Sequence, residues 1–252
     1  MLLTPLEQFQ IISLFSLKLF CFDFSITNML LINLISFFIL FILVYLFSYN
    51  NKHFFYIPGN WQVMIETLYD IISQMLYDNI NDSGEKYFPF VSTLAIFILS
   101  LNLIGLVPYS FTTTSHIIIT LSLSTTVFFG VTFIAIQNHK LEMLSLFMPA
   151  NTSFLMALIL VPIEFISYMF KPISLGVRLF ANLMAGHTLL KVIAGFAWSM
   201  LLLDDLFLST MHLTPLLLLI ILMGLELLVA VVQTYVFVTL TIVYLNDSIN
   251  LH

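Results

Sequence analysis

The sequence predicts an all-α integral membrane protein with about five membrane-crossing helices and one amphipathic surface helix. Of its 252 residues, 61% are hydrophobic and only 8% are charged, whereas soluble domains average about 45–50% apolar and about 25% charged residues. The mean hydropathy is +1.09. Seven basic and 13 acidic side chains cannot cover a soluble core of this size. A soluble enzyme is therefore excluded, and a net charge of −6 without a basic patch excludes a nucleic-acid-binding protein.

Five segments are apolar and long enough to cross a bilayer, which takes about 20 residues of helix. They are residues 26–47, 89–107, 117–136, 152–200 and 213–245. The last two exceed a single crossing, so we expect them to be strongly tilted. The segment 152–200 contains two prolines and is either one kinked helix or two short helices, of which the kinked helix is favoured.

Residues 61–81 are not apolar enough to cross a membrane and predict an amphipathic helix at its surface. Apolar side chains recur at helical spacing from Trp61 to Leu76, and acidic and amide side chains occupy the other side. The acidic face argues against anionic lipid as the main attraction. A docking role toward a protein partner and a simple solvated face are both open.

The N-terminal residues 1–24 are apolar but interrupted by one proline and three charged residues. They lack the basic start of a secretory signal and the arginines of a mitochondrial transit peptide. We expect a segment at one membrane face, with a short cleaved leader as the alternative. The single cysteine, Cys21, excludes an internal disulfide framework and any Cys-based metal site, and we expect neither a cofactor nor a bound metal.

Positive charge sets the orientation. Lysines follow the first span, precede the second and follow the third, whereas the loops on the opposite side carry neither Lys nor Arg; these lysines are Lys52, Lys86 and Lys140. The positive-inside rule assigns their side to the matrix or cytoplasm. The N-terminus is then outside, and the C-terminus, after five crossings, is inside.

The chain's one arginine, Arg178, lies in the middle of an apolar tract. A charge at a helix centre costs about 2.5–3.5 kcal/mol, and a guanidinium cannot lose its proton. We therefore expect water or a carboxylate to face Arg178, the carboxylate coming from a neighbouring polypeptide. At 100° per residue, Glu164, Lys171 and Asn182 share its side of the helix, and His187 falls opposite. Lys171 is expected to reach the inner headgroups.

The last two tracts predict an antiparallel hairpin that turns at the acidic pair 204–205. Residues equidistant from the turn then lie at the same height, which puts His187 beside Glu226 and Arg178 beside Gln233. A buried His–Glu pair suits a proton relay, because histidine titrates near neutrality and burial can tune a carboxyl toward it. A purely structural pair is the alternative.

Glu164 lies about 21 Å from Arg178 along an ideal helix, toward the inner face. The pair His187 and Glu226 lies on the outer side. Titratable groups on both sides of one fixed cation predict two half-length aqueous paths that do not connect, with Arg178 blocking direct proton passage between them.

Residues 171–187 (KPISLGVRLFANLMAGH) resemble the signature of subunit a (subunit 6) of F-type ATP synthases. Residues 226–245 resemble the family's last helix, and residues 102–108 (NLIGLVP) resemble its second-span motif. The similarity extends from about residue 61 to the C-terminus. It implies that Arg178 faces the carboxylates of the rotating c-ring and that Glu164 lines the inner half-channel. It assigns five residues to the outer half-channel: Asn102, Asn182, His187, Glu226 and Gln233.

The resemblance implies a proton-channel stator subunit of the Fo sector, which couples the proton gradient to ring rotation and ATP synthesis. Its partners would be the c-ring, peripheral-stalk and other Fo subunits, and membrane lipid. The chain lacks a GxxxxGK[ST] loop, so we expect it to be non-catalytic. His187 and Glu226 are exchanged relative to many bacterial members, as in mitochondrial and alphaproteobacterial ones. The 26 phenylalanines and the single arginine fit an AT-rich organelle genome, which favours the mitochondrial inner membrane, with an alphaproteobacterial plasma membrane as the alternative.

Two other classes compete with this interpretation. A secondary transporter could use Arg178 to bind an anion, but such proteins usually show paired halves with broken helices, which the sequence lacks. A haem-binding electron carrier needs paired axial ligands, and His187 is the one histidine placed deep in a span. Proton and sodium coupling are both open, because the ring supplies the ion site.

Overall fold

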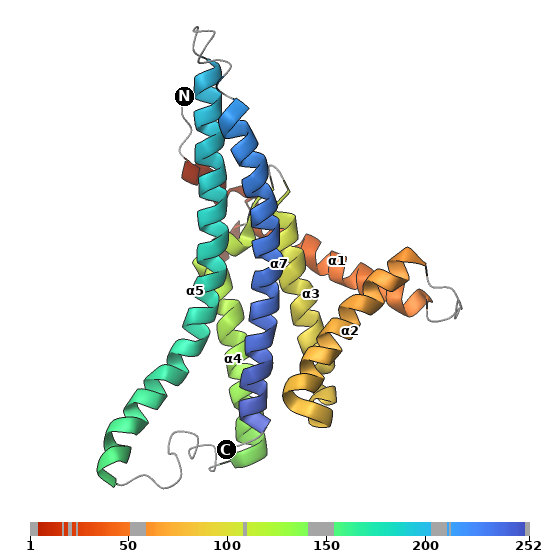
Figure 1. Cartoon of the computed structure of the whole chain (residues 1–252), viewed down its shortest axis with the longest axis vertical. Helices are drawn as coiled ribbons and strands as arrows, with labels where there is room; N and C mark the ends of the chain where they lie inside the picture. The colour runs from red at the N-terminus through yellow and green to blue at the C-terminus, as the bar shows by residue number, and fades with distance from the viewer. Residues whose placement is uncertain are drawn as a thin grey trace. The chain divides into compact units, whose positions relative to one another are not determined.

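The computed structural model describes residues 5–16, 18–19, 22–23, 25–50, 59–107, 110–140, 154–202, 211 and 213–249. Long helices dominate it, which confirms the predicted all-α membrane fold (Figure 1). The helices are α1 (Asn28–Asn50), α2 (Asn60–Ile80), α3 (Phe88–Gly105), α4 (Ile117–His139), α5 (Phe154–Leu201) and α7 (Leu213–Ile249). Short 3-10 turns are η1 (Pro5–Phe9), η2 (Asn81–Tyr87) and η3 (Thr113–Ser115).

Within the described residues, four helical stretches are long and apolar enough to cross a membrane. They are Gly84–Gly105, Ile117–His139, Met156–Leu201 and Leu213–Ile249. The first predicted span, 26–47, also forms a helix, but the apolar stretch described there is the shorter Asn28–Ile39. A fifth crossing at this segment therefore stays a prediction.

The chain divides into two compact units. Unit 1 contains residues 1–41, 97–116 and 179–234, and unit 2 contains residues 42–96, 117–178 and 235–252. Helices α1, α3, α5 and α7 each contribute residues to both units. The candidate site residues therefore divide into two groups, which are considered separately.

Unit 1 begins with short strands that the sequence did not predict. Strand β1 (Ser13–Phe15) pairs antiparallel with β4 (Ile26–Thr27), and β2 (Lys18–Leu19) pairs with β3 (Phe22–Asp23). The Thr27 hydroxyl accepts a hydrogen bond from the Leu30 amide at 3.3 Å. This is the contact expected of an N-cap residue, and it ends the strand where α1 begins.

The rest of unit 1 contains the predicted hairpin. Asn182 of α5 contacts Gln233 of α7, and His187 approaches Glu226. The partner on α7 falls in number as the residue on α5 rises, so the two helices are antiparallel, as predicted. Leu179, Leu183 and Ala230 are buried along this contact, and the turn between the helices lies outside the described residues.

Unit 2 packs α4 against the first half of α5 and the end of α7. Helix α5 continues through Pro162 and Pro172 as one helix, which confirms the favoured alternative, and Figure 1 shows its N-terminal half bending. Proline removes a backbone hydrogen bond and kinks a helix interior. Helix α4 is rich in hydroxyl residues, and side chains such as Thr125 and Thr132 donate to backbone carbonyls of their own helix. This satisfies their hydroxyls without water.

Helix α2, also in unit 2, confirms the predicted amphipathic helix. Ile65, Ile72 and Leu76 are buried along one stripe, whereas Met64 and Ile71 beside them are more than half exposed. The helix therefore has one apolar stripe against the unit and a second that faces outward. An outward apolar stripe next to a polar face is what a helix lying at a membrane surface requires.

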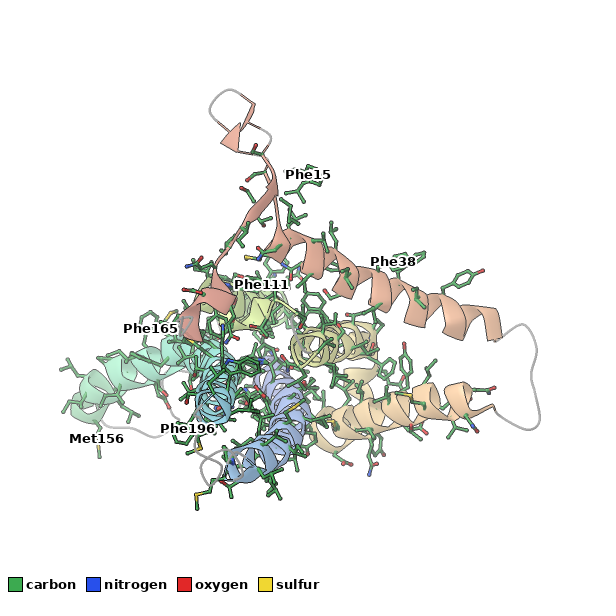
Figure 2. All side chains as sticks on the ribbon, turned by 90° about the horizontal axis from the view of Figure 1, so that it is seen from above. Phe15, Phe38, Phe111, Met156, Phe165 and Phe196 are labelled. Atoms are coloured by element: carbon green, nitrogen blue, oxygen red, sulfur yellow. The ribbon has the colours of Figure 1, made fainter. Side chains whose placement is uncertain are left out.

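Large apolar side chains cover much of the outside of both units. Phe38, Met156 and Phe196, labelled in Figure 2, are 63%, 65% and 55% exposed, whereas Phe111 is buried. Exposed apolar area on this scale marks contact with a membrane or with other proteins.

Candidate functional site

Five of the predicted site residues come together in unit 1, from three helices. We call them the His187–Glu226 cluster: Asn102 from α3, Asn182 and His187 from α5, and Glu226 and Gln233 from α7. Four are wholly or largely buried, and Asn182 is exposed. The cluster thus runs from the interior to the surface of the unit.

His187 and Glu226 form the centre of the cluster. His187 Nδ1 lies 3.4 Å from Glu226 Oε1, and the two side chains are 14% and 6% exposed. This confirms the pairing predicted from the hairpin. The distance permits an ion pair, but the atoms are not aligned as a hydrogen bond, so Glu226 Oε1 remains without a hydrogen-bond partner among the described residues. The other ring nitrogen, His187 Nε2, also has none there.

Amides extend the cluster along α7. The Asn182 amide Nδ2 donates to Gln233 Oε1 at 2.9 Å. Fully buried Asn102 donates to the Thr234 hydroxyl at 3.2 Å and to the Ala230 carbonyl at 3.4 Å. The sequence analysis placed Gln233 level with Arg178 and did not identify Asn182 as its partner. Positions 178 and 182 are only one helical turn apart, and a turn position assumed from the sequence is too imprecise to distinguish them.

Several buried polar atoms of the cluster have no hydrogen-bond partner within the described chain. They are Asn102 Oδ1, His187 Nε2, Glu226 Oε1 and Gln233 Nε2. Buried polar atoms in proteins are nearly all hydrogen-bonded, to protein or to ordered water. Four such atoms in one cluster therefore indicate a place for internal water.

A glycine makes room for the Glu226 carboxylate. A Cβ added to Gly186 would lie 2.7 Å from Glu226 Oε1 and 3.2 Å from its Cδ, which is closer than real Cβ atoms approach. The structure shows that the group Gly186 approaches is the carboxylate itself.

Arg178 belongs to unit 2 and is exposed on α5. Two residues earlier, Gly176 lies against α4 so closely that a Cβ would be 2.7 Å from Ser124 Oγ and 3.0 Å from the Thr120 carbonyl. This contact fixes the backbone next to Arg178. Among the described residues, no carboxylate lies within ion-pair distance of its guanidinium.

The sequence did not predict a polar contact of Lys171 in unit 2. Lys171 Nζ lies 3.5 Å from Asp247 Oδ2 and also stands over the rings of Tyr168 and Tyr244, at 5.4 and 4.8 Å from their centroids. We call these four residues the Lys171–Asp247 cluster. The sequence analysis expected Lys171 to reach the inner headgroups. It did not identify Asp247 as a partner, because it ended the last apolar tract at residue 245, whereas α7 continues to Ile249.

Glu164, the predicted inner-side acid, lies in the first half of α5 and is half-buried. Its Oε2 atom is buried and has no hydrogen-bond partner in the part of the chain that the structure describes. In that same part, no three His, Cys, Asp or Glu side chains are grouped so that they could hold a metal ion.

Comparison with known proteins gives one consistent result. The family model "ATP synthase A chain" matches residues 29–246. A protein of Pylaiella littoralis named ATP synthase subunit a is 51% identical, over 99% of each chain. Proteins of the same name are 46% identical in Chondrus crispus, over 99% of this chain and 97% of the relative, and 42% identical in Marchantia polymorpha, over 99% of each.

Proposed function

The chain belongs to the ATP synthase A chain family, and from this premise we propose that it forms two offset half-channels that bring protons to and from the c-ring at Arg178. Membership makes it a membrane subunit of the proton-translocating Fo sector, which works with other ATP synthase components. The observation that carries the finer proposal is the buried His187–Glu226 pair with its unpartnered polar atoms.

The outer half-channel is proposed to follow the His187–Glu226 cluster. A histidine and a carboxylate at 3.4 Å can exchange a proton through a small movement or one water. The amides of Asn182, Gln233 and Asn102 cannot titrate, but they can hold water in place by donating and accepting hydrogen bonds. Titratable side chains linked by ordered water would give protons a path into the membrane.

Arg178 is proposed to separate the two half-channels. A ring carboxylate is neutral while it faces lipid, and it is stabilised as the anion next to a guanidinium that cannot lose its proton. It then releases its proton toward Glu164 and the inner side, and the next carboxylate is reprotonated from His187 and Glu226. A membrane potential contributes about 2.3 kcal/mol per charge and 100 mV, which biases ring rotation.

The location proposed is the mitochondrial inner membrane, with the C-terminus on the matrix side, and the alphaproteobacterial plasma membrane is the alternative. The lysine-bearing loops support this orientation. The partners proposed are the c-ring, which supplies the carboxylates, and the peripheral-stalk and other Fo subunits, which cover the exposed apolar faces together with lipid. The chain itself is proposed to be non-catalytic.

Arg178→Lys tests the proposal, because a lysine that the c-ring and lipid shield from water in the assembled complex can become neutral, whereas a guanidinium cannot. In the assembled ATP synthase reconstituted into vesicles, we expect loss of proton-driven ATP synthesis, with proton leak as a further readout. Lys191→Gln, which removes a charge from the same helix, is the matched control and should leave synthesis intact. Full ATP-driven proton pumping by the Arg178→Lys complex would contradict the proposal.

Crosslinking tests the partner separately. In a Cys21→Ser background, Val177→Cys places a thiol on the exposed surface beside Arg178, and Leu175→Cys places one on the buried side. We expect adducts with the c-ring from Val177→Cys only. Adducts with another subunit alone would show that a different protein faces Arg178.

A further inference from the structure

The last part of the connection between α3 and α4, in unit 1, is polar in sequence, yet residues 112–115 are buried. Thr112, Thr113, Thr114 and Ser115 are 5%, 1%, 1% and 4% exposed. Connections usually run over the surface, because buried irregular backbone leaves polar groups that are hard to satisfy. Four consecutive buried hydroxyl residues between two apolar helices are more than packing requires.

The hydroxyls of this connection fall into two kinds. Ser115 Oγ donates to the Thr112 carbonyl at 2.6 Å, as a structural turn residue does. Thr113 Oγ1, Thr114 Oγ1 and His116 Nε2 are buried and have no hydrogen-bond partner among residues 5–249 that the structure describes. Since ordered water is the usual partner of such atoms, these three atoms point to internal water.

The connection lies next to the His187–Glu226 cluster. A Cβ added to Gly105 would be 3.1 Å from Thr112 Cγ2 and 4.0 Å from His187 Nε2. Gly105 therefore lies between the connection and the imidazole, and its lack of a side chain lets Thr112 approach the backbone next to His187. His187 Nε2, one of the unpartnered atoms, is the nearest polar atom among the three neighbours of this position, after two carbon atoms of Thr112.

His116 closes the connection at its α4 end. Its ring stacks on buried Phe111, with ring centroids 5.3 Å apart, and this contact orients the imidazole. Burial lowers the pKa of His116 from 6.5, so the ring is neutral at pH 7. A neutral imidazole carries one donor and one acceptor nitrogen, and it can link two waters.

We propose that residues 112–116 form the mouth of the outer half-channel, where the hydroxyls of Thr113 and Thr114 and the imidazole of His116 hold water that passes protons to His187. The inference rests on the proposed function and adds residues that it does not include. Each transfer moves a proton along one hydrogen bond to the next oxygen or nitrogen, and the donor is reprotonated from the outer side. No group is consumed.

The double variant Thr113→Val, Thr114→Val removes both hydroxyls and keeps the side-chain shape. In the assembled ATP synthase in vesicles, we expect passive proton flux through Fo to fall several-fold. Thr126→Val, which removes an exposed hydroxyl bonded to its own helix, is the matched control and should not change the flux. Unchanged flux in the double variant would overturn the proposal.

Silver ions test for water directly, whether or not the valine variants assemble. In a Cys21→Ser background, Thr114→Cys should make ATP-driven proton pumping sensitive to Ag⁺, because a hydrated path brings the ion to the thiol. Val131→Cys is as buried, at 3% exposure, but is apolar and lies on α4, and it should stay insensitive. Insensitivity at position 114 would also overturn the proposal.

A His187→Ala complex separates the two levels of inference. If it loses proton flux while the variants of the connection behave normally, the proposed mouth is wrong and the half-channel stands. If it conducts normally, the proposed path through the His187–Glu226 cluster is wrong as well.

Discussion

Helices α5 and α7 make two contacts between ionisable side chains that have nearly the same length and different surroundings. In unit 1, His187 and Glu226 are 3.4 Å apart, with side chains 14% and 6% exposed. In unit 2, Lys171 and Asp247 are 3.5 Å apart, with side chains 32% and 44% exposed. Distance alone would class the two contacts together.

The two contacts differ in how much hydrogen-bonding capacity of their side chains remains unused. Lys171 is held by a carboxylate and two tyrosine rings, and such a fixed cation braces the two helices. The pair His187 and Glu226 is deeper, yet each partner keeps a polar atom without a hydrogen bond in the described chain. Burial combined with unused hydrogen-bonding capacity costs stability, so its presence supports the proposed role of the pair in proton transport over a purely structural one.

The largest effect is expected at Glu226. Glu226→Gln keeps the shape but removes the proton-carrying group, and we expect proton-driven ATP synthesis to fall by about 100-fold or more, the usual cost of losing a positioned acid–base group. The measurement is synthesis by the reconstituted complex under an imposed proton gradient. Glu85→Gln, at an exposed carboxylate of η2, should have no effect, and near-normal synthesis by Glu226→Gln would make the pair structural.

A second prediction concerns the helix contact beside Arg178. In Gly176→Ala the new methyl would meet the Thr120 backbone carbonyl at 3.0 Å and Ser124 Oγ at 2.7 Å, and backbone cannot rotate away. We expect a destabilisation of about 1–3 kcal/mol, typical of overpacking, and less assembled complex. Thermal inactivation of the purified complex measures it. An unchanged inactivation midpoint would mean that α4 and α5 are not in close contact there.

Hydropathy and helical geometry predicted the spans, the antiparallel hairpin and the contact between His187 and Glu226. These depend on long apolar runs and on distance from a turn, which the sequence states directly. The partner of Lys171 could not be predicted, because it depends on how far α7 continues past the apolar run. The buried connection at Thr113 was missed because a short polar segment between two spans usually indicates exposure.

The close contact between Gly186 and the Glu226 carboxylate gives a third prediction. Its expected effect on stability is smaller, because the neighbouring side chain can move. A methyl there would meet Glu226 Oε1 at 2.7 Å, and a flexible carboxylate can rotate away. We expect Gly186→Ala to cost about 1 kcal/mol and to slow proton transport several-fold by displacing the carboxylate from His187. Gly195→Ala on the same helix has nothing within 4 Å of the new methyl and should stabilise by about 0.5–1 kcal/mol. Equal stability and equal proton transport in the two variants would contradict a close contact between Gly186 and the Glu226 carboxylate.

The smallest effect is expected at Asp247. Asp247→Asn removes the negative charge beside Lys171, but a half-exposed pair contributes at most about 1 kcal/mol, and the tyrosine rings still hold the ammonium through contacts of about 0.5–1 kcal/mol. Thermal inactivation should shift slightly, and proton-driven synthesis should stay close to that of the parent complex. A double-mutant cycle with Lys171→Met isolates the pair, with coupling below about 1 kcal/mol expected. A loss of synthesis comparable to that of Glu226→Gln would place the Lys171–Asp247 cluster in the proton path and remove the distinction between the two contacts.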